Sequence, residues 1–475
     1  MKTKSTFLLI ILFIIVSLLF SNKTNAQVVL YGVTSSGGDS NAGTVFSVTP
    51  TGILTTIASL KASVASQPDG SLLYANDGNF YASSVTGGFD DSCTIFQCSP
   101  TGTLKTMINL DSVWGSSDPL GNSLIQAMDG FLYGMTTQGG PNLIGVLFKL
   151  PLSGHYTAVH FFNDTDGAMP YGSLIQTKDS MLWGMTSAGG IIDSGVGLGN
   201  IFHCTPSGEF TSVFSFDSID GINPYGDLLL ANDGNFYGLT SFGGKYGYGT
   251  LFRYKPSGTF TKLVDFNDTN GAVPYGSLIQ ASDGNLYGLT SAGGDSDQGT
   301  LFSYTLSGNL NTLLKFNNGT GVMPYGTLIQ ASDNNLYGMT NMGGNNSMGT
   351  IFQYTLSGNF TKLVDFNMLN GAYPEYGKLI EINDKANAIK EVYNVINTDV
   401  FPNPNNGQFT IQLSGISGQS SVEIYNMLGE KVFPQLSITN YPLSVSLNQP
   451  NGLYLYRILD ENGNATSTGK FVIQK

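Results

Sequence analysis

The stretch LYGLTSAGGDSDQGTLFSYTLSG, residues 286–308, decides the fold, because it returns almost unchanged as LYGMTNMGGNNSMGTIFQYTLSG at residues 336–358. Weaker copies of the same phrase occur along most of the chain at intervals of about 50 residues. The aromatic residue near the start of each copy falls at Tyr31, Tyr81, Tyr133, Trp183, Tyr237, Tyr287 and Tyr337. Seven copies at a nearly constant period predict a repeat architecture.

One repeat unit, read from residue 274, divides into four short apolar segments. They are PYGSLIQA, LYGLTS, GTLFSY and LNTLLKF, and turn residues separate them. Asp283-Gly284 between two apolar segments predicts a tight hairpin, because glycine adopts the positive φ that such a turn needs. No segment has a helical period. The unit is therefore typical of a four-stranded blade, and seven units predict an all-β, seven-bladed propeller over residues 27–383.

The two ends of the repeat array predict how the ring closes. The first copy begins with VVLYGVT at residues 28–34 and has no PYGSLIQ segment before it. The last copy is followed by an extra segment of that type, YGKLIEI, at residues 376–382. We expect this C-terminal segment to become the inner strand of the first blade. Pairing of N- and C-terminal strands would leave no open sheet edge between the first and last blades.

The first 26 residues have the features of a secretory signal peptide. Lys2 and Lys4 precede an apolar run over residues 7–20, which is too short to span a bilayer as a helix. No second long apolar run follows, so we expect no transmembrane segment in the mature chain. The formal net charge of the whole chain is −13, and an acidic surface repels phosphate backbones. Nucleic acid is therefore not an expected partner.

The repeat pattern resembles a known bacterial family. Tyr-Gly-x-Thr, followed by Gly-Gly and then Gly-Thr-x-Phe, is similar to the Gloeo-Verruco (GloVer) tandem repeat of exported proteins, roughly over residues 28–383. The second copy departs from the pattern, with Tyr81-Ala82-Ser83-Ser84, and the third has Gly145-Val146 in place of Gly-Thr. The resemblance implies the propeller architecture and export, and it implies no particular activity.

The C-terminal part of the chain has a different pattern. After a predicted linker at residues 384–397, residues 398–475 alternate apolar residues with Pro, Asn and Gly corners, which predicts a small β-sandwich. Four ordered blocks resemble the type A C-terminal sorting domain of the Bacteroidetes type IX (Por) secretion system. The motif residues are Pro402, Asn403, Pro404, Gly407, Gly469 and Lys470. The resemblance implies the type IX secretion machinery as a partner and a secreted or outer cell-surface location. The alternative is an ordinary adhesive sandwich domain.

The residue inventory of the ring contains no recognisable catalytic constellation. Arg253 is its only arginine, so an arginine cluster that grips a carboxylate, as in sialidases, is excluded. Glutamate occurs in the ring only at Glu209, Glu375 and Glu381, which is a poor basis for the carboxylate pair of a glycoside hydrolase. We therefore predict a non-catalytic protein with no cofactor.

Acidic loops before the Pro-Tyr-Gly segments suggest one hypothesis, which is calcium binding. Calcium prefers hard oxygen ligands, and these loops combine carboxylates with glycine. The speculative ligands are Asp164, Asp166, Asp217, Asp220 and Asp268. The alternative is that Asp and Asn serve there as turn residues, because their side chains hydrogen-bond to nearby backbone groups.

The tyrosine of Pro-Tyr-Gly suggests a second hypothesis. It recurs where the outer strand of one blade crosses to the inner strand of the next, on the face that carries the Gly-Gly loops. The residues are Tyr171, Tyr225, Tyr275, Tyr325 and Tyr376. A partial ring of tyrosines around a funnel would stack on sugars or on peptide side chains. The alternative is a wedge that fills the gap between neighbouring blades.

Two classes of function remain. In the first, the ring is a non-catalytic module for binding or surface display, with an extracellular glycan or protein as its ligand. In the second, it is a secreted hydrolase or lyase that acts on glycans through loop aspartates. Two carboxylates beside a deep pocket would favour the enzyme, whereas a shallow and uncharged surface would favour binding.

Overall fold

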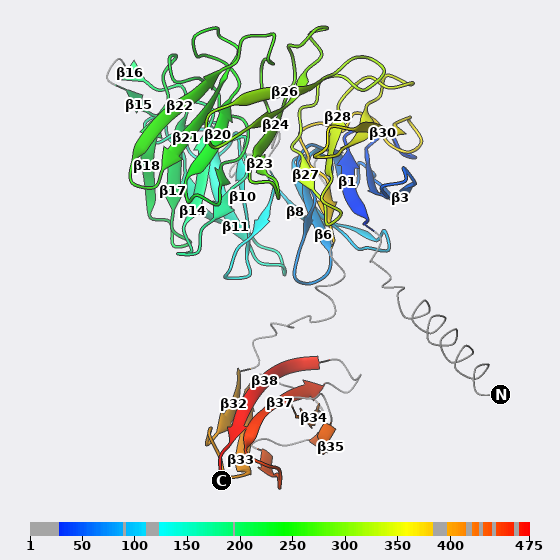
Figure 1. Cartoon of the computed structure of the whole chain (residues 1–475), viewed down its shortest axis with the longest axis vertical. Coiled ribbons are helices and arrows are strands. Elements are labelled where there is room, and N and C mark those ends of the chain that lie inside the picture. Colours follow the sequence, from blue (N-terminus) through cyan, green and yellow to red (C-terminus); the bar gives the residue numbers. More distant parts are fainter. Residues whose placement is uncertain are drawn as a thin grey trace, which may run out of the picture. The chain divides into compact units, whose positions relative to one another are not determined.

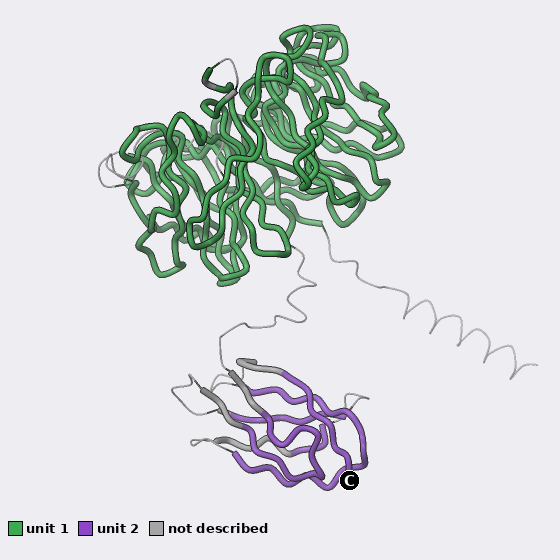
Figure 2. Tube along the Cα trace, turned by 90° about the vertical axis from the view of Figure 1, so that its left-hand side faces the viewer, with its two compact units in different colours: residues 1–382 green, residues 383–475 purple. Residues whose placement is uncertain are grey.

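The computed structural model describes most of the chain outside its N-terminus. The described residues are 28–88, 92–110, 123–192, 195–382, 397–414, 420–426, 431–438, 443–459 and 465–475. The chain forms two compact units, residues 1–382 and residues 383–475 (Figure 2). The predicted signal peptide and residues 384–396 of the predicted linker lie outside the described residues.

The first unit is a β-propeller, and its described residues form seven antiparallel blades (Figure 1). The sixth blade shows the pattern, with the order β23 (Ile279–Gln280), β24 (Leu286–Thr290), β25 (Thr300–Tyr304) and β26 (Leu310–Lys315). The predicted architecture is therefore confirmed. The inner strand is shorter than the predicted eight-residue segment, because Ser277 hydrogen-bonds to the next blade instead of pairing within its own sheet.

The other blades repeat this arrangement. Their strands are β1 (Leu30–Thr34), β2 (Thr44–Val48) and β3 (Leu54–Ser59) in the first; β4 (Ser66–Pro68), β5 (Leu73–Tyr74), β6 (Phe80–Thr86), β7 (Thr94–Cys98) and β8 (Leu104–Asn109) in the second; β9 (Ile125–Gln126), β10 (Leu132–Thr136), β11 (Val146–Leu150) and β12 (Thr157–Phe161) in the third; β13 (Ile175–Gln176), β14 (Leu182–Thr186), β17 (Asn200–Cys204) and β18 (Phe210–Ser215) in the fourth; β19 (Leu229–Leu230), β20 (Phe236–Thr240), β21 (Thr250–Lys255) and β22 (Thr259–Asp265) in the fifth; and β27 (Ile329–Gln330), β28 (Leu336–Thr340), β29 (Thr350–Tyr354) and β30 (Phe360–Asp365) in the seventh.

Two blades depart from the four-stranded pattern. In the second blade, β4 and β5 both pair with β6, so two short strands share the inner position. In the fourth blade, the Gly-Gly loop is longer and forms a separate ribbon of β15 (Ile191–Ile192) and β16 (Gly195–Val196). This ribbon accounts for the longer interval between the fourth and fifth copies of the repeat.

The ring closes as predicted. The strand β31 (Ile380–Glu381) pairs antiparallel with β1, and the partners are Leu30 with Glu381 and Tyr31 with Ile380. Leu30 and Leu379 are fully buried, in one core cluster with Tyr337 and Phe366 of the last blade. Figure 1 shows β1 beside β27 and β28. The closing strand therefore completes the first blade and also seals it against the seventh.

The recurring Tyr-Gly-x-Thr and Gly-Thr-x-Phe phrases have a packing explanation. Gly288 lies opposite Phe302 in the sheet, and a Cβ on Gly288 would lie only 2.5 Å from Phe302 Cζ. Two residues further on, the buried hydroxyl oxygens of Thr290 and Thr300 lie 2.8 Å apart and share a hydrogen bond. The glycine thus makes room for the aromatic ring, and the threonine pair holds the end of the two strands together.

The departure in the second copy keeps most of this packing. Ala82 replaces the glycine opposite Phe96 and is fully buried, so one methyl group is accommodated there. Ser84 replaces the first threonine, and its hydroxyl oxygen lies 2.6 Å from that of Thr94. The second blade therefore retains the hydroxyl pair despite its different sequence.

The second unit consists of two sheets that face one core. One sheet has β32 (Asn397–Phe401), β33 (Gln408–Ser414) and β36 (Leu443–Ser446); the other has β35 (Lys431–Ile438), β34 (Ser420–Tyr425), β37 (Gly452–Leu459) and β38 (Ala465–Ile473). Ile411 and Val445 from the first sheet share a buried cluster with Ile424, Ile458 and Phe471 from the second. Two sheets around one apolar core form the predicted small β-sandwich.

Candidate functional site

Each crossover between blades is clamped before its Pro-Tyr-Gly segment begins. Between the fifth and sixth blades, Val273 has a φ of 53°, a left-handed conformation that is uncommon for a β-branched residue. Its N–H donates to Tyr248 O at 3.0 Å, and its carbonyl oxygen accepts from Ser291 N and from Ser291 Oγ. Ala272 forms a bridge with Ala292 beside the Gly-Gly loop. The tyrosines and the Gly-Gly loops therefore lie on one face, as predicted.

The glycines of Pro-Tyr-Gly lie in close backbone contact with the neighbouring blade. A Cβ on any of these glycines would overlap the carbonyl oxygen of a glycine in the next blade. The residues are Gly172, Gly226, Gly276, Gly326 and Gly377. The five inner strands that follow these glycines therefore begin in direct backbone contact with a neighbouring blade, and the adjacent tyrosines are carried inward together.

The structure brings all five predicted tyrosines into one cluster. Their ring centroids are 4.8 Å apart for Tyr171 and Tyr225, 5.2 Å for Tyr225 and Tyr275, 5.3 Å for Tyr275 and Tyr325, and 5.4 Å for Tyr325 and Tyr376. Edge-to-face contacts alternate with stacked ones, which are the arrangements that aromatic pairs prefer. The tyrosines therefore pack against one another, and ligand binding by them stays a prediction.

A second ring, which the sequence analysis missed, lies beside the tyrosines. Each blade contributes one residue from the start of its inner strand, and most of these residues carry a side-chain oxygen. The residues are Ser71, Ser123, Ser173, Asp227, Ser277, Thr327 and Lys378. We call this set the hydroxyl ring. The recurring Ser, Asp or Thr after Pro-Tyr-Gly was the signal that would have revealed much of it.

Hydrogen bonds run around the hydroxyl ring from blade to blade. At all but one step, the backbone N–H of one member donates to the side-chain oxygen of the next, as from Ser277 N to Thr327 Oγ1 at 2.8 Å. Six of the seven steps are made in this way, with distances of 2.5 to 3.1 Å. The sixth bond, from Lys378 N to Ser71 Oγ, joins the end of the repeat array to its beginning.

The tyrosines and the hydroxyl ring enclose a cavity of about 230 Å³. Its lining includes four of the tyrosines and every member of the hydroxyl ring. Burial raises the pKa of Tyr225 to about 12, and the neighbouring Tyr171 and Tyr275 add to the shift. Burial likewise raises the pKa of Tyr376, with further contributions from Asp69 and Glu375. The phenols of Tyr225 and Tyr376 therefore stay protonated at neutral pH and keep their O–H groups as possible donors.

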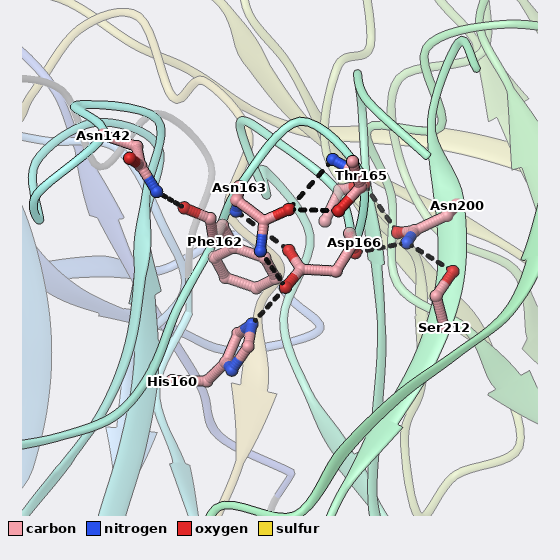
Figure 3. A network of polar contacts seen from close by, with 9 residues as sticks. Asn142, His160, Phe162, Asn163, Thr165, Asp166, Asn200 and Ser212 are labelled. Atoms are coloured by element: carbon pink, nitrogen blue, oxygen red, sulfur yellow. Dashed lines mark hydrogen bonds and ion pairs between the residues drawn. The ribbon is translucent and has the colours of Figure 1, made fainter. Parts of the chain in front are cut away.

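The proposed calcium ligands lie in three separate crossovers. The side chains of two of these ligands, Asp166 and Asp217, accept hydrogen bonds from backbone N–H groups of their own turns. Figure 3 shows the first crossover, where Asp166 Oδ2 lies 3.0 Å from His160 Nε2 and Asp166 Oδ1 accepts from Asn163 N at 2.9 Å. In the second, Asp217 Oδ1 accepts from the backbone N–H groups of Ile219 and Asp220, each at 2.8 Å. These bonds are those of aspartates in turns.

The remaining proposed ligands accept hydrogen bonds through their carbonyl oxygens. That of Asp220 accepts from Thr250 Oγ1 at 2.7 Å. The carbonyl oxygens of Asp164 and Asp268 each accept a hydrogen bond from a Gly-Gly loop, from Gly190 N and Gly294 N respectively, at 2.8 Å. Among the residues that the structure describes, no group of three or more His, Cys, Asp or Glu side chains could hold a metal ion. The geometry favours turn chemistry, and calcium binding stays a prediction that one experiment tests.

We expect a chelator to leave the thermal unfolding midpoint of the protein unchanged. A cation bound only to the folded state stabilises it by mass action, so removing a calcium ion from these loops would lower the midpoint. The measurement is a melting curve by circular dichroism in excess EDTA, in excess calcium and in neither. A midpoint that falls in EDTA and recovers with calcium, but not with magnesium, would contradict the turn explanation.

The sorting-motif residues lie at both ends of the C-terminal sandwich sequence and meet in the fold. Asn403 Oδ1 accepts from Val472 N at 2.9 Å, next to Pro402 and Pro404. Gly407 has a φ of 97°, and its N–H donates to Asn405 Oδ1. The loop that carries the first motif block is therefore hydrogen-bonded to the last strand of the chain.

The second motif block lies on that last strand. Gly469 pairs with Tyr456 of β37, and a Cβ at this position would overlap the phenol ring. The adjacent Lys470 is exposed. These contacts explain the two motif positions by packing and by solvent exposure.

A buried carboxylate on the second sheet of the sandwich was also missed by the sequence analysis. Glu423 is 4% exposed and receives hydrogen bonds from Lys431 Nζ at 2.6 Å, from Arg457 Nη2 at 2.6 Å and from Tyr425 OH at 2.7 Å. Burial opposes its ionisation, but these three donors outweigh burial and lower its pKa to about 2. Glu423 therefore ties β34 to β35 and β37 as a charged group.

These features define an exported β-propeller with a C-terminal sorting domain. Residues 399–474 match the secretion system C-terminal sorting domain, which marks the chain as a protein that is exported across the outer membrane and is secreted or surface-located. The chain belongs to the Gloeobacter/Verrucomicrobia repeat family, whose model matches residues 21–197 and 193–395. Both resemblances predicted from the sequence are confirmed. Within the described part of the chain, no helix has the length and hydropathy needed to cross a bilayer.

Solved structures add evidence on the fold alone. A candidate 6-phosphogluconolactonase from Bacteroides fragilis is 15% identical, and the match covers 76% of this chain and 99% of that one with a TM-score of 0.52. A similar candidate from Bacteroides uniformis is 14% identical over 74% of this chain and 99% of that one, also with a TM-score of 0.52. No curated protein matches this chain.

Proposed function

We propose that the propeller is a non-catalytic binding module that holds one sugar unit of an extracellular glycan in its axial cavity. The observation that supports this proposal is the composition of the cavity wall, in which tyrosine rings stand next to a circle of hydroxyl groups. Aromatic faces pack on the C–H faces of sugars, and hydroxyl groups exchange hydrogen bonds with sugar hydroxyls. The sorting domain then serves to deliver this module outside the cell.

The size of the cavity supports a small ligand. At about 230 Å³ it is smaller than the roughly 300–1,000 Å³ of sites that enclose drug-sized molecules. A single sugar ring suits this volume better than a longer chain segment. A protein ligand would have to reach the cavity with one side chain, which is the second form of the binding hypothesis.

The carboxylates of the ring argue against the alternative of a glycan hydrolase or lyase. Among the residues that line the cavity, Asp227 is the only carboxylate, and its Oδ1 already accepts the N–H of Ser173 at 2.5 Å. Hydrolysis of a glycosidic bond ordinarily needs two carboxyl groups within about 10 Å. The side chains of Asp166 and Asp217 bond to their own turns, so they are poorly placed to serve as that pair.

A binding experiment with sugars tests the proposal. We expect the full mature chain to bind a subset of monosaccharides in isothermal titration calorimetry, and Tyr225→Ala to weaken that binding by about tenfold. The control is Tyr246→Ala, because Tyr246 is 49% exposed on a Gly-Gly loop and does not line the cavity. Failure to bind any sugar would refute the proposal. Release of new reducing ends from a polysaccharide would favour the enzyme instead.

A further inference from the structure

The hydroxyl ring is interrupted at one step, and the interruption has the chemistry of an anion site. At six steps of the ring, the backbone N–H of one member donates to a side-chain oxygen of the next blade. Thr327 is followed by Lys378, which has no side-chain oxygen, so this one step cannot form. Within the described residues, Thr327 N–H has no hydrogen-bond partner, although Thr327 Oγ1 accepts from Ser277 N.

Lys378 occupies the ring position that supplies an acceptor in the other blades, and it brings a positive charge to the cavity instead. Lys378 lines the cavity, and no ion pair or hydrogen bond joins its ammonium group to another described residue. A buried N–H that lacks an acceptor is costly, and an ammonium group in the same cavity favours a negatively charged oxygen. The two donors therefore suit the same ligand group.

The charges around the cavity limit which negatively charged ligand group suits Lys378 and Thr327 N–H. Asp227 also lines the cavity, in the fifth blade, and the sixth blade and Thr327 of the seventh separate it from Lys378. Asp69 and Glu375 act electrostatically on Tyr376, another lining residue. A doubly charged anion such as phosphate would be repelled by these three carboxylates. A single carboxylate on a molecule rich in hydroxyl groups fits better, because the hydroxyls also donate to Asp227.

We propose that Lys378 and Thr327 N–H form a carboxylate subsite and that the ligand of the cavity is a sugar acid of the uronic acid class. This inference rests on the proposed function, since it names the ligand class of the same cavity. In this arrangement the carboxylate accepts from the ammonium group and from the free N–H, and the sugar hydroxyls meet the Ser and Thr members of the hydroxyl ring. The tyrosines cover one face of the sugar.

The test compares sugar acids with their neutral counterparts on the full mature chain. Isothermal titration calorimetry is run with D-glucuronate and D-galacturonate, and with D-glucose and D-galactose. We expect at least one of the two acids to bind about tenfold more tightly than its neutral counterpart, because it gains a charge-assisted hydrogen bond. Inorganic phosphate is measured separately as a competitor, and we expect it to compete weakly.

One substitution separates the ligand role of Lys378 from a structural role. Lys378→Thr supplies the missing oxygen, so Thr327 N–H gains the acceptor that the other six steps already have. We expect this variant to lose the preference for the acid, to keep its affinity for the neutral sugar, and to melt at the same temperature as the wild type or higher. The control is Lys255→Thr, which removes one exposed charge outside the cavity and should change neither property.

The outcomes distinguish the two proposals. If the wild type binds neutral sugars and acids equally, or if Lys378→Thr keeps the preference for the acid, the carboxylate subsite is wrong and the sugar-binding module stands. A lower melting temperature of Lys378→Thr would also overturn the subsite, because it would make the lysine a structural residue. Tighter binding of phosphate than of either acid would overturn the carboxylate assignment. If no sugar of any kind binds, the proposed function itself fails.

Discussion

Replacing Gly276 with alanine is expected to destabilise the propeller by about 3 kcal/mol or more. The new methyl group would overlap the carbonyl oxygen of Gly326 in the next blade. A flexible side chain could move aside, but here the obstacle is backbone that is held in turn by its own neighbour around the ring. The smaller unfolded-state entropy of alanine stabilises by only about 0.4–1 kcal/mol, so the steric term dominates.

Urea denaturation followed by tryptophan fluorescence or circular dichroism measures this effect. The matched control is Gly319→Ala, because Gly319 is exposed, and the nearest atom to its added Cβ would be Asn317 Oδ1 at 3.2 Å. That control should cost less than about 1 kcal/mol. Equal losses of stability in the two variants would show that the inner strands do not meet as closely as described. The loss should also appear as a lower affinity of the cavity for its ligand.

Replacing Leu379 with aspartate is expected to have the larger effect, about 4 kcal/mol or more, and to open the ring. Leu379 is fully buried with Leu30 of the first blade and Phe366 of the last. A carboxylate there would be desolvated among apolar side chains. Separation of β31 from β1 would relieve that cost, but it would leave β1 as an unpaired edge strand. Such an edge pairs with other chains, so aggregation should accompany the loss of stability.

Size-exclusion chromatography and thermal unfolding test this second prediction together. Leu306→Asp is the control, because Leu306 is 39% exposed in a turn and should tolerate a charge. A monomeric Leu379→Asp variant with a normal melting temperature would contradict the closure mechanism. A variant that melts early and elutes as large species would support it, provided that Leu306→Asp behaves like the wild type.

Much of the fold could be predicted from the sequence because the signals are local and repeated. The spacing of the aromatic residues from Tyr31 to Tyr337 sets the number of blades, and the Asp-Gly turns set the hairpins. Gly284, for example, adopts a φ of 84° in the turn where it was predicted. The closing strand was also predictable, since a missing first strand and an extra last strand are visible in the order of the segments.

The candidate site was predictable only in part. The five tyrosines stood out because they follow proline at a constant place in the repeat, and the structure does bring them together. Their neighbours in the hydroxyl ring did not stand out. Ser71 follows Asp-Gly and Ser123 follows Gly-Asn, so neither continues the Pro-Tyr-Gly pattern. The significance of Lys378 depends on both, because it becomes an exception only once the ring around it is known.

The amino-acid order by itself determined the repeat, the number of blades, the closure of the ring and the presence of a sorting domain. These properties follow from local turn chemistry and from patterns that recur every 50 residues or so. Only the tertiary structure decided which side chains face the axis and which hydrogen bonds join them. The bond between Lys378 N and Ser71 Oγ links residues 307 positions apart. No local pattern specifies such a contact, because it exists only when seven separate sheets meet around one axis.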